Sequence, residues 1–193
     1  MAKLPVLPLV LGLVGSPREG GNSDLLTDEI LKTANARGAR TEKIILSSLR
    51  VAACRACDTG SDDGRCLIED DFQYIYAKVK EASVIVLSSP VYFGSVSAQT
   101  KTVIDRFQCH WQAFGRGGRK TAEKKRGVFI CVSGLSRRDF FKNAAKVVKN
   151  FFATIGAQYY GELFCPGVEG RGDVLRHPEY MRKSQDLGKY LMR

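Results

Sequence analysis

The sequence is poor in histidine and lacks two common nucleotide-binding signatures. It has two histidines in 193 residues, His110 within a predicted helix and His177 at the start of another, and we interpret both as structural rather than catalytic. The first predicted strand is not followed by Gly-x-Gly-x-x-Gly, which disfavours a dinucleotide-binding Rossmann site. Nor does Gly-Lys-Ser/Thr follow it, which excludes a nucleotide-hydrolysing P-loop.

Long apolar runs are also absent, so nothing in the sequence predicts a membrane span. At the N-terminus one lysine precedes an apolar stretch, as in a secretory signal peptide, but Pro5 and Pro8 interrupt the stretch and no small-x-small cleavage site follows it. We therefore expect a buried strand after Pro8 and a cytoplasmic location. In that compartment the six cysteines indicate reduced thiols, metal ligands or core packing rather than a disulfide framework.

Acidic residues are outnumbered, with 20 Asp and Glu against 30 Lys and Arg and a net charge of +10. This balance suits phosphate-bearing ligands, nucleic acid or anionic surfaces, although simple solubility also explains it. The run "GRGGRKTAEKKR" at 115–126 would be the footprint of a nucleic-acid partner. It precedes a predicted strand, at the end of the sheet opposite the ligand-binding loops, so we interpret it as solvated surface and expect no nucleic-acid partner.

Strand and helix patterns alternate along the whole chain. Continuous apolar runs such as "LVLGLV" are typical of strands covered on both faces, and apolar residues spaced i, i+3, i+4 and i+7 predict the helices between them. Because no linker, internal repeat or low-complexity tract interrupts this alternation, we expect one domain, 1–193, of the α/β class with a doubly wound parallel sheet. The predicted strands are 9–14, 41–46, 83–87, 127–132 and 157–164, and the predicted helices are 23–37, 71–81, 97–111, 139–155 and 177–191.

The loops that follow the strands form the candidate ligand site, because ligands of parallel sheets bind at the carboxyl ends of the strands. The first loop, "GSPREGGNS", leads into a helix N-terminus, where unpaired N–H groups and the helix dipole favour an anion. Ser16, Asn22 and Ser23 add short hydrogen-bonding groups, and Arg18 adds a charged fork. The loop therefore indicates a phosphate site, the alternative being a plain strand–helix turn with a serine cap. The candidate loops are 15–23, 47–70, 88–97, 133–139 and 165–176.

The loop after the third strand carries adjacent aromatic residues. It belongs to the segment "SSPVYFGSVSAQTKTVIDR" at 88–106, in which Tyr92 and Phe93 lie between Pro90 and Gly94. Adjacent aromatics at the end of a strand can be core filler. Between a proline and a glycine, however, they are placed where a flat ring could stack on them.

Together, "GSPREGGNSDLL" and "SSPVYFGSVSAQTKTVIDR" resemble the flavodoxin-like NAD(P)H-dependent FMN reductases, and in particular their iron–sulfur flavoprotein branch. The resemblance covers nearly the whole chain. It implies a three-layer fold with helices on both faces of a five-stranded sheet in the order 2-1-3-4-5, and FMN at the edge of that sheet. It further implies that the FMN phosphate binds Ser16, Arg18, Asn22 and Ser23, that the ring lies against Pro90, Val91, Tyr92, Phe93, Gly94 and Ser95, and that Ser133 and Gly134 form a third flavin loop.

The resemblance implies an oxidoreductase in which the flavin carries the chemistry and no side chain acts as a catalytic acid or base. NAD(P)H would reduce FMN, and a small acceptor such as a quinone, free flavin, a nitro compound, an oxyanion or oxygen would reoxidise it. Arg137 and Arg138 follow the fourth strand and would help to select NADPH, unless they are a surface pair at a helix start. An iron–sulfur flavoprotein electron carrier and a non-catalytic flavin-binding module remain alternatives. The resemblance also implies a homodimer or homotetramer.

The segment "ACRACDTGSDDGRC" at 53–66 raises the question of a metal cluster. Cys54, Cys57 and Cys66 are close in sequence, but a cubane cluster normally needs four thiolates, and zinc faces the same shortage. The third cysteine expected from the iron–sulfur branch is missing near Gly60. Cys109, Cys131 and Cys165 lie elsewhere in the chain. We therefore predict no cluster, and a remnant loop that shapes the flavin pocket.

Overall fold

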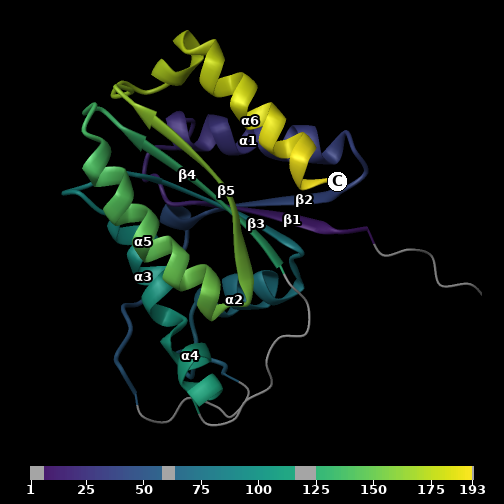
Figure 1. Cartoon of the computed structure of the whole chain (residues 1–193). Coiled ribbons are helices and arrows are strands. Elements are labelled where there is room, and N and C mark those ends of the chain that lie inside the picture. Colours follow the sequence, from purple (N-terminus) through teal and green to yellow (C-terminus); the bar gives the residue numbers. More distant parts are fainter. Residues whose placement is uncertain (1–6, 58–63, 116–124, 193) are drawn as a thin grey trace, which may run out of the picture.

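The computed structural model describes residues 7–57, 64–115 and 125–192, and it contains a parallel sheet of five strands in the order β2-β1-β3-β4-β5 (Figure 1). This is the flavodoxin-like order, so the predicted fold class and strand order are confirmed. The carboxyl ends of all five strands lie at one edge of the sheet because every pairing is parallel. The strands are β1 (Leu9–Val14), β2 (Arg40–Ile45), β3 (Val84–Pro90), β4 (Lys125–Ser133) and β5 (Ala157–Pro166).

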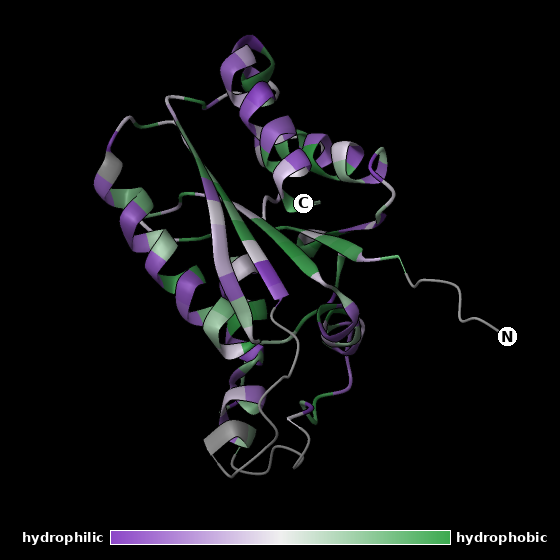
Figure 2. Ribbon diagram, turned by 45° about the vertical axis from the view of Figure 1, so that its right-hand side comes forward, coloured by the Kyte–Doolittle hydropathy of each residue, from purple (hydrophilic) through white to green (hydrophobic). Residues whose placement is uncertain are grey.

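Helices cover both faces of the sheet and bury two separate apolar cores (Figures 1 and 2). Along β1, Leu11 faces one core and Val10 the other, as the alternation of side chains in a strand requires. One face is covered by α1 (Asn22–Asn35) and α6 (Pro178–Leu191). The other face is covered by α2 (Phe72–Glu81), α3 (Ala98–Arg106) and α5 (Arg138–Thr154), with α4 (Gln108–Gly115) beyond α3; η1 (Leu46–Ser48) and η2 (Asp173–Arg176) are short 3-10 turns.

Close packing at β1 positions the loop that follows it. A Cβ atom on Gly12 would lie 2.8 Å from Cγ2 of Thr27 on α1, so glycine lets this helix approach the strand. Farther along, a Cβ on Gly15 would lie 1.8 Å from Oγ1 of Thr100 on α3. The Gly15 N–H donates to the carbonyl of Ser88 over 2.7 Å. The loops after β1 and β3 are therefore held against each other.

The predicted helix 97–111 is two helices in the structure. The chain turns at Phe107, between α3 and α4, so the periodicity of the first helix does not continue into the second. In one helix over 97–111 the i, i+4 spacing of Val103, Phe107 and Trp111 predicts that all three face inward. Val103 and Phe107 are buried, but Trp111 has 59% of its surface exposed. The prediction was wrong there because a helical pattern is meaningful only while the helix axis keeps its direction.

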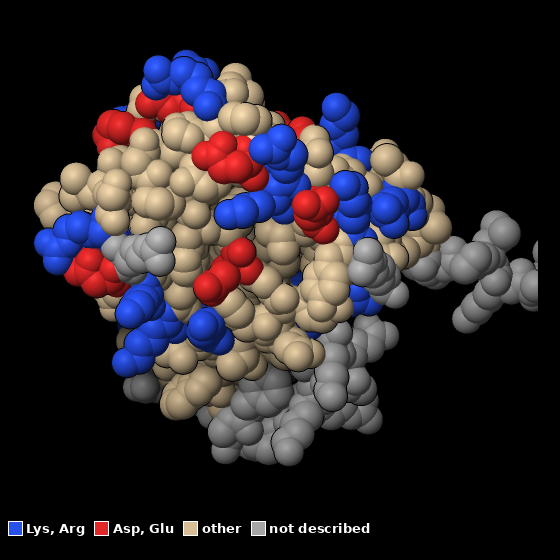
Figure 3. Space-filling view, turned by 45° about the horizontal axis from the view of Figure 1, so that its top comes forward, with Lys and Arg blue, Asp and Glu red and all other residues tan. Residues whose placement is uncertain are grey.

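The charged surface shows no single basic patch on the face in Figure 3, where Lys and Arg side chains are interspersed with Asp and Glu. Most of the basic run at 115–126 falls on residues 116–124, outside the described ranges, while Lys125 and Arg126 begin β4. Within the part of the chain described here, no helix has both the length and the apolar character needed to span a bilayer.

Candidate functional site

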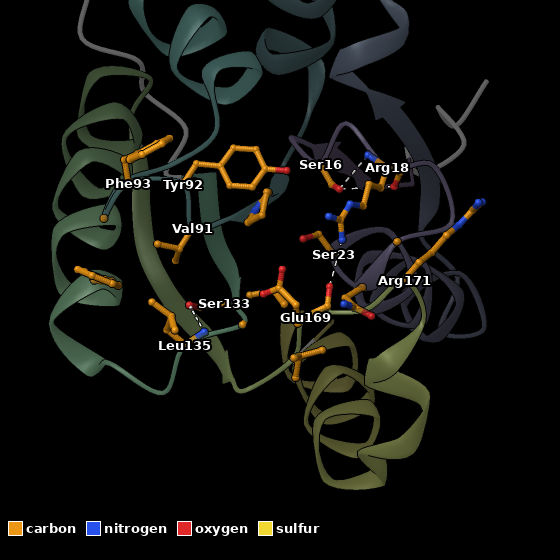
Figure 4. A pocket seen from close by; sticks show the side chains of 18 residues that line it. Ser16, Arg18, Ser23, Val91, Tyr92, Phe93, Ser133, Leu135, Glu169 and Arg171 are labelled. Atoms are coloured by element: carbon orange, nitrogen blue, oxygen red, sulfur yellow. Dashed lines mark hydrogen bonds between the residues drawn. The ribbon is translucent and has the colours of Figure 1, made fainter.

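A cavity of about 430 Å³ lies at the carboxyl edge of the sheet (Figure 4). It is bordered by the loops after β1, β3, β4 and β5. The structure therefore brings together every residue predicted to bind the cofactor except Ser95, which is paired with Tyr92 in a tight turn. The lining residues are Ser16, Arg18, Gly21, Asn22, Ser23, Pro90, Val91, Tyr92, Phe93, Gly94, Val132, Ser133, Gly134, Leu135, Phe140, Val168, Glu169 and Arg171.

One end of the cavity is the N-terminus of α1. Its cap residue is Gly21, and no side chain caps the helix, so N–H groups of the first turn are open to a ligand. The one acidic residue of that turn, Asp24, is already neutralised: Oδ1 lies 2.6 Å from Nζ of Lys43, and Oδ2 accepts the Gly20 N–H over 2.8 Å. With Arg18 beside it, this end of the cavity favours an anion.

Asn22 has a different role from the one predicted for its side chain. It is buried, its Nδ2 donates to the carbonyl of Gly170 over 2.8 Å, and its Oδ1 accepts the Val174 N–H over 3.1 Å. The amide thus fastens the loop after β5 to the start of α1. Toward an anion, Asn22 offers its backbone N–H as the first residue of the helix.

The opposite end of the cavity is the aromatic loop after β3. The Val91 N–H donates to the carbonyl of Val132 over 2.8 Å, which ties this loop to β4. Phe93 and Gly94 both have positive φ, 49° and 75°, a conformation that is uncommon for a phenylalanine. The turn holds Phe93 fully exposed at the rim, and Nδ2 of Asn143 donates to the carbonyl of Gly94 over 2.8 Å.

The loop after β4 forms the floor between these ends. Ser133 Oγ accepts the Leu135 N–H over 3.1 Å. Arg137 lies just outside the cavity, with its guanidinium 4.6 Å from the ring centroid of Phe140 and 2.7 Å from Asp139. Arg138 is the first residue of α5. The structure therefore places Arg137 against a residue of the cavity wall rather than inside the cavity.

Seven lining residues were not among the predicted cofactor-binding residues: Gly21, Val132, Leu135, Phe140, Val168, Glu169 and Arg171. The last three belong to the loop after β5, at 167–172. The position of that loop after a strand marked it as part of the candidate edge, but no motif within it indicated which side chains reach the cavity. The backbone path decides this, with Gly167 at φ 73° and Gly172 at φ 77°.

The cysteine segment lies away from the cavity lining. Cys54 and Cys57 are half-buried, and Cys66 is buried with the Nε of Arg106 donating to its Sγ over 3.3 Å. The prediction that this segment shapes the pocket finds no support, because none of its described residues borders the cavity. In the described ranges, which omit 58–63, no three His, Cys, Asp or Glu side chains are grouped to hold a metal ion.

The remaining thiols and His110 have environments typical of core residues. Burial raises the pKa of Cys109 to about 12 and that of Cys165 to about 12, so both are protonated at neutral pH. Burial, together with nearby Lys80, lowers the pKa of His110, whose ring packs edge-on against Tyr76. These groups are part of the packing and stand apart from the cavity.

Comparisons with known proteins agree with this geometry. An iron–sulfur flavoprotein of Methanocaldococcus jannaschii is 45% identical over 97 residues, 50% of this chain and 50% of that protein. The match thus spans about half the length of this relative, as it does for a second, from Methanosarcina thermophila, at 38% identity. A solved NAD(P)H:quinone oxidoreductase from Methanothermobacter marburgensis superposes with a TM-score of 0.72 over 96% of this chain and 100% of that one, at 14% identity, a likeness that shows the fold.

The sequence profile of the family described as NADPH-dependent FMN reductase matches residues 8–165. This range includes the loops after β1, β3 and β4, the three that contain all of the predicted cofactor-binding residues. Because the match covers well over half of the chain, the chain belongs to the NADPH-dependent FMN reductase family.

Proposed function

We propose that this protein binds FMN in the cavity at the carboxyl edge of the sheet and transfers electrons from NAD(P)H to a small acceptor. The observation that carries the proposal is one cavity with two chemically different ends. An uncapped helix N-terminus with Arg18 suits a phosphate, and the aromatic loop of Tyr92 and Phe93 suits a flat ring. The family to which the chain belongs supports the same cofactor.

The residues of the cavity fit FMN in charge as well as in shape. Asp24, the acidic residue in the first turn of α1, is held by Lys43 and the Gly20 N–H, so a dianionic phosphate at this helix N-terminus would meet N–H groups and a guanidinium. Bound FMN supplies the hydride and electron chemistry. The chain's own contribution would be to bind the two ends of the cofactor, the phosphate at the N-terminus of α1 and the ring at the aromatic loop after β3.

We infer the reductant and the oligomeric state from the family and from the residues around the cavity. NADPH is the proposed donor, because the family is described by it and because Arg137 and Arg138 lie at the N-terminus of the helix beside the cavity, as its cap and its first residue. We also propose a cytoplasmic homodimer or homotetramer, since an open cavity with the exposed Phe93 at its rim is a site that a second subunit can complete.

The test is titration of the purified protein with FMN, followed by steady-state assay with NADPH and a panel of quinones, nitro compounds and free flavin. We expect stoichiometric quenching of flavin fluorescence and FMN-dependent oxidation of NADPH. A protein that binds FMN but never oxidises NADPH would be a flavin-binding module. A protein that binds no FMN would contradict the proposal altogether.

A further inference from the structure

Glu169 is the one acidic side chain among the residues that line the cavity. In Figure 4 it lies between the group of Arg18 and Ser23 and the group of Ser133 and Leu135, with its carboxylate toward the cavity. It lies outside residues 8–165, the range matched by the family profile. We propose that Glu169 binds the sugar-alcohol chain of FMN through its hydroxyl groups, an inference that rests on the proposed FMN site.

The backbone around Glu169 is fixed at both ends. Before it, the Val168 N–H donates to the carbonyl of Ser133 over 2.9 Å. After it, the carbonyl of Gly170 accepts from Asn22 and the Gly170 N–H donates to Asp173 over 2.6 Å. The carbonyl of Glu169 itself accepts from Nη1 of Arg18 over 3.1 Å. A loop bonded in this way presents its side chain to the cavity in a defined position.

The side chain lies over a glycine that leaves room for it. A Cβ atom on Gly134 would lie 1.5 Å from Oε2 of Glu169 and 2.6 Å from its carboxyl carbon. Any larger residue at this position would displace the carboxylate. The absence of a side chain at Gly134 thus allows the acid to lie close to the floor of the cavity.

The charge of the Glu169 carboxylate and its role as a hydrogen-bond acceptor limit which part of FMN it can contact. An ionised carboxylate only accepts hydrogen bonds, and it would repel the phosphate. FMN carries hydroxyl donors on the chain that joins the phosphate to the ring. Because Glu169 lies between the phosphate end and the loop of Ser133, those hydroxyls are the donors within its reach. None of the ion pairs found among the described residues includes Glu169, so its carboxylate oxygens are available.

The test uses three flavins that differ by one part each: FMN, riboflavin, which lacks the phosphate, and lumiflavin, which also lacks the hydroxylated chain. Dissociation constants are measured by fluorescence quenching. For Glu169→Ala we expect FMN and riboflavin each to bind about tenfold more weakly, and lumiflavin to bind as in the wild type. Glu169→Gln retains an accepting oxygen without charge and should lose less.

Two further variants calibrate the result. Arg18→Ala should weaken FMN more than riboflavin, because its guanidinium serves the phosphate. Glu162→Gln removes an exposed carboxylate on β5 that bonds Tyr159, away from the cavity, and should change none of the three affinities.

Three outcomes would overturn the role of Glu169 while leaving the FMN site intact. One is unchanged binding of FMN and riboflavin to Glu169→Ala. Another is an equal loss for lumiflavin, which would mean a contact with the ring. The third is tighter binding, which would mean that the carboxylate obstructs the cavity and must leave it. Failure of the wild-type protein to bind any of the three flavins would instead overturn the proposed function together with this inference.

Discussion

Arg106 is a charged side chain buried inside the fold. Only 1% of its surface is exposed. Its guanidinium forms a bidentate pair with Asp70, at 2.6 and 3.1 Å. It also donates to the carbonyls of Ala52 and Ile68 and to the Sγ of Cys66. One side chain on α3 therefore fastens both ends of the cysteine segment, and each of its donors has an acceptor, as a buried charge requires.

We predict that Arg106→Met lowers the free energy of unfolding by about 3 kcal/mol, because it leaves the half-buried carboxylate of Asp70 without its guanidinium partner. Urea denaturation measures the change. Arg40→Met is the matched control: Arg40 pairs with Glu81 over 2.8 Å on the exposed surface, and its loss should cost less than about 1 kcal/mol. Equal midpoints for the two variants would show that the buried pair contributes nothing special.

The pair of Arg106 and Asp70 also predicts that the free energy of unfolding depends on pH. Burial alone would raise the pKa of Asp70, but hydrogen bonds from Arg106 and from the N–H groups of Ala52 and Phe72 lower it below its ordinary value of 3.8. A lowered pKa in the folded state means that stability is present above 3.8 and falls as the pH drops through the folded value. In Asp70→Asn this part of the acid dependence should vanish from a series of urea titrations, whereas an unchanged series would contradict the assignment.

A residue-scale prediction also concerns the choice of nicotinamide. Replacing Arg137 and Arg138 together by alanine should reduce the preference for NADPH over NADH, because arginine binds the additional phosphate. The ratio of kcat/KM for the two reductants measures it. Arg137 is paired with Asp139 in the structure, so Asp139→Ala, which frees this guanidinium, should leave the preference intact or increase it. An unchanged ratio in the double variant would mean that the pair has no such role.

At the scale of elements, α1 is bonded to the loop after β5, and both border the cavity. Asn22 bonds both Gly170 and Val174 from the first residue of the helix. We predict that Asn22→Ala lowers the free energy of unfolding by about 1–3 kcal/mol, since two buried backbone groups lose their partner. FMN affinity should fall as well, and hydrogen exchange at the Val174 amide should accelerate.

Asn35 supplies the control on the same helix. Its Nδ2 donates to the carbonyl of Ala39 over 3.2 Å at the C-terminal end of α1, away from the cavity. Asn35→Ala should therefore reduce stability without changing flavin affinity. If both variants bind FMN as the wild type does, the loop after β5 has no part in the site.

The sequence patterns predicted helices and strands better than they predicted contacts between residues distant in the chain. The strand β1 and the side chains of Glu169 and Arg106 show why. The apolar run of β1 was predicted correctly because burial on both faces of a sheet is a local consequence of sequence. The loop into α1 borders the cavity, and its phosphate-binding role stays a prediction. Glu169 could not be identified as a lining residue, because its position depends on bonds to Asn22 and Arg18, about 150 residues away. Arg106 was missed for a related reason: periodicity assigns a charged side chain to solvent, and only the fold reveals its buried partner.

At the scale of the whole molecule, the strand order agrees with the family, and the six cysteines are divided between the segment 53–66 and the two cores. Cys109, Cys131 and Cys165 are buried in the two cores with pKa values raised mainly by burial, and burial of this kind opposes the thiolate form that a cluster requires. Cys66 already accepts a hydrogen bond from Arg106. In this chain a guanidinium holds the segment in place.

We therefore predict that the protein purified without oxygen contains FMN but neither iron nor labile sulfide in stoichiometric amount. Three neighbouring cysteines supply too few thiolates for a cubane cluster, and Arg106 and Asp70 already fix the segment without one. Metal and sulfide assays on the anaerobic protein measure this directly, and Cys57→Ser should leave the visible spectrum unchanged. Stoichiometric iron with absorbance that Cys57→Ser abolishes would contradict the prediction, and would require a fourth ligand from outside 53–66. Cys109 would be the first candidate, because nearby Cys66 is among the causes that raise the pKa of Cys109, and Cys109→Ser would then be the deciding variant.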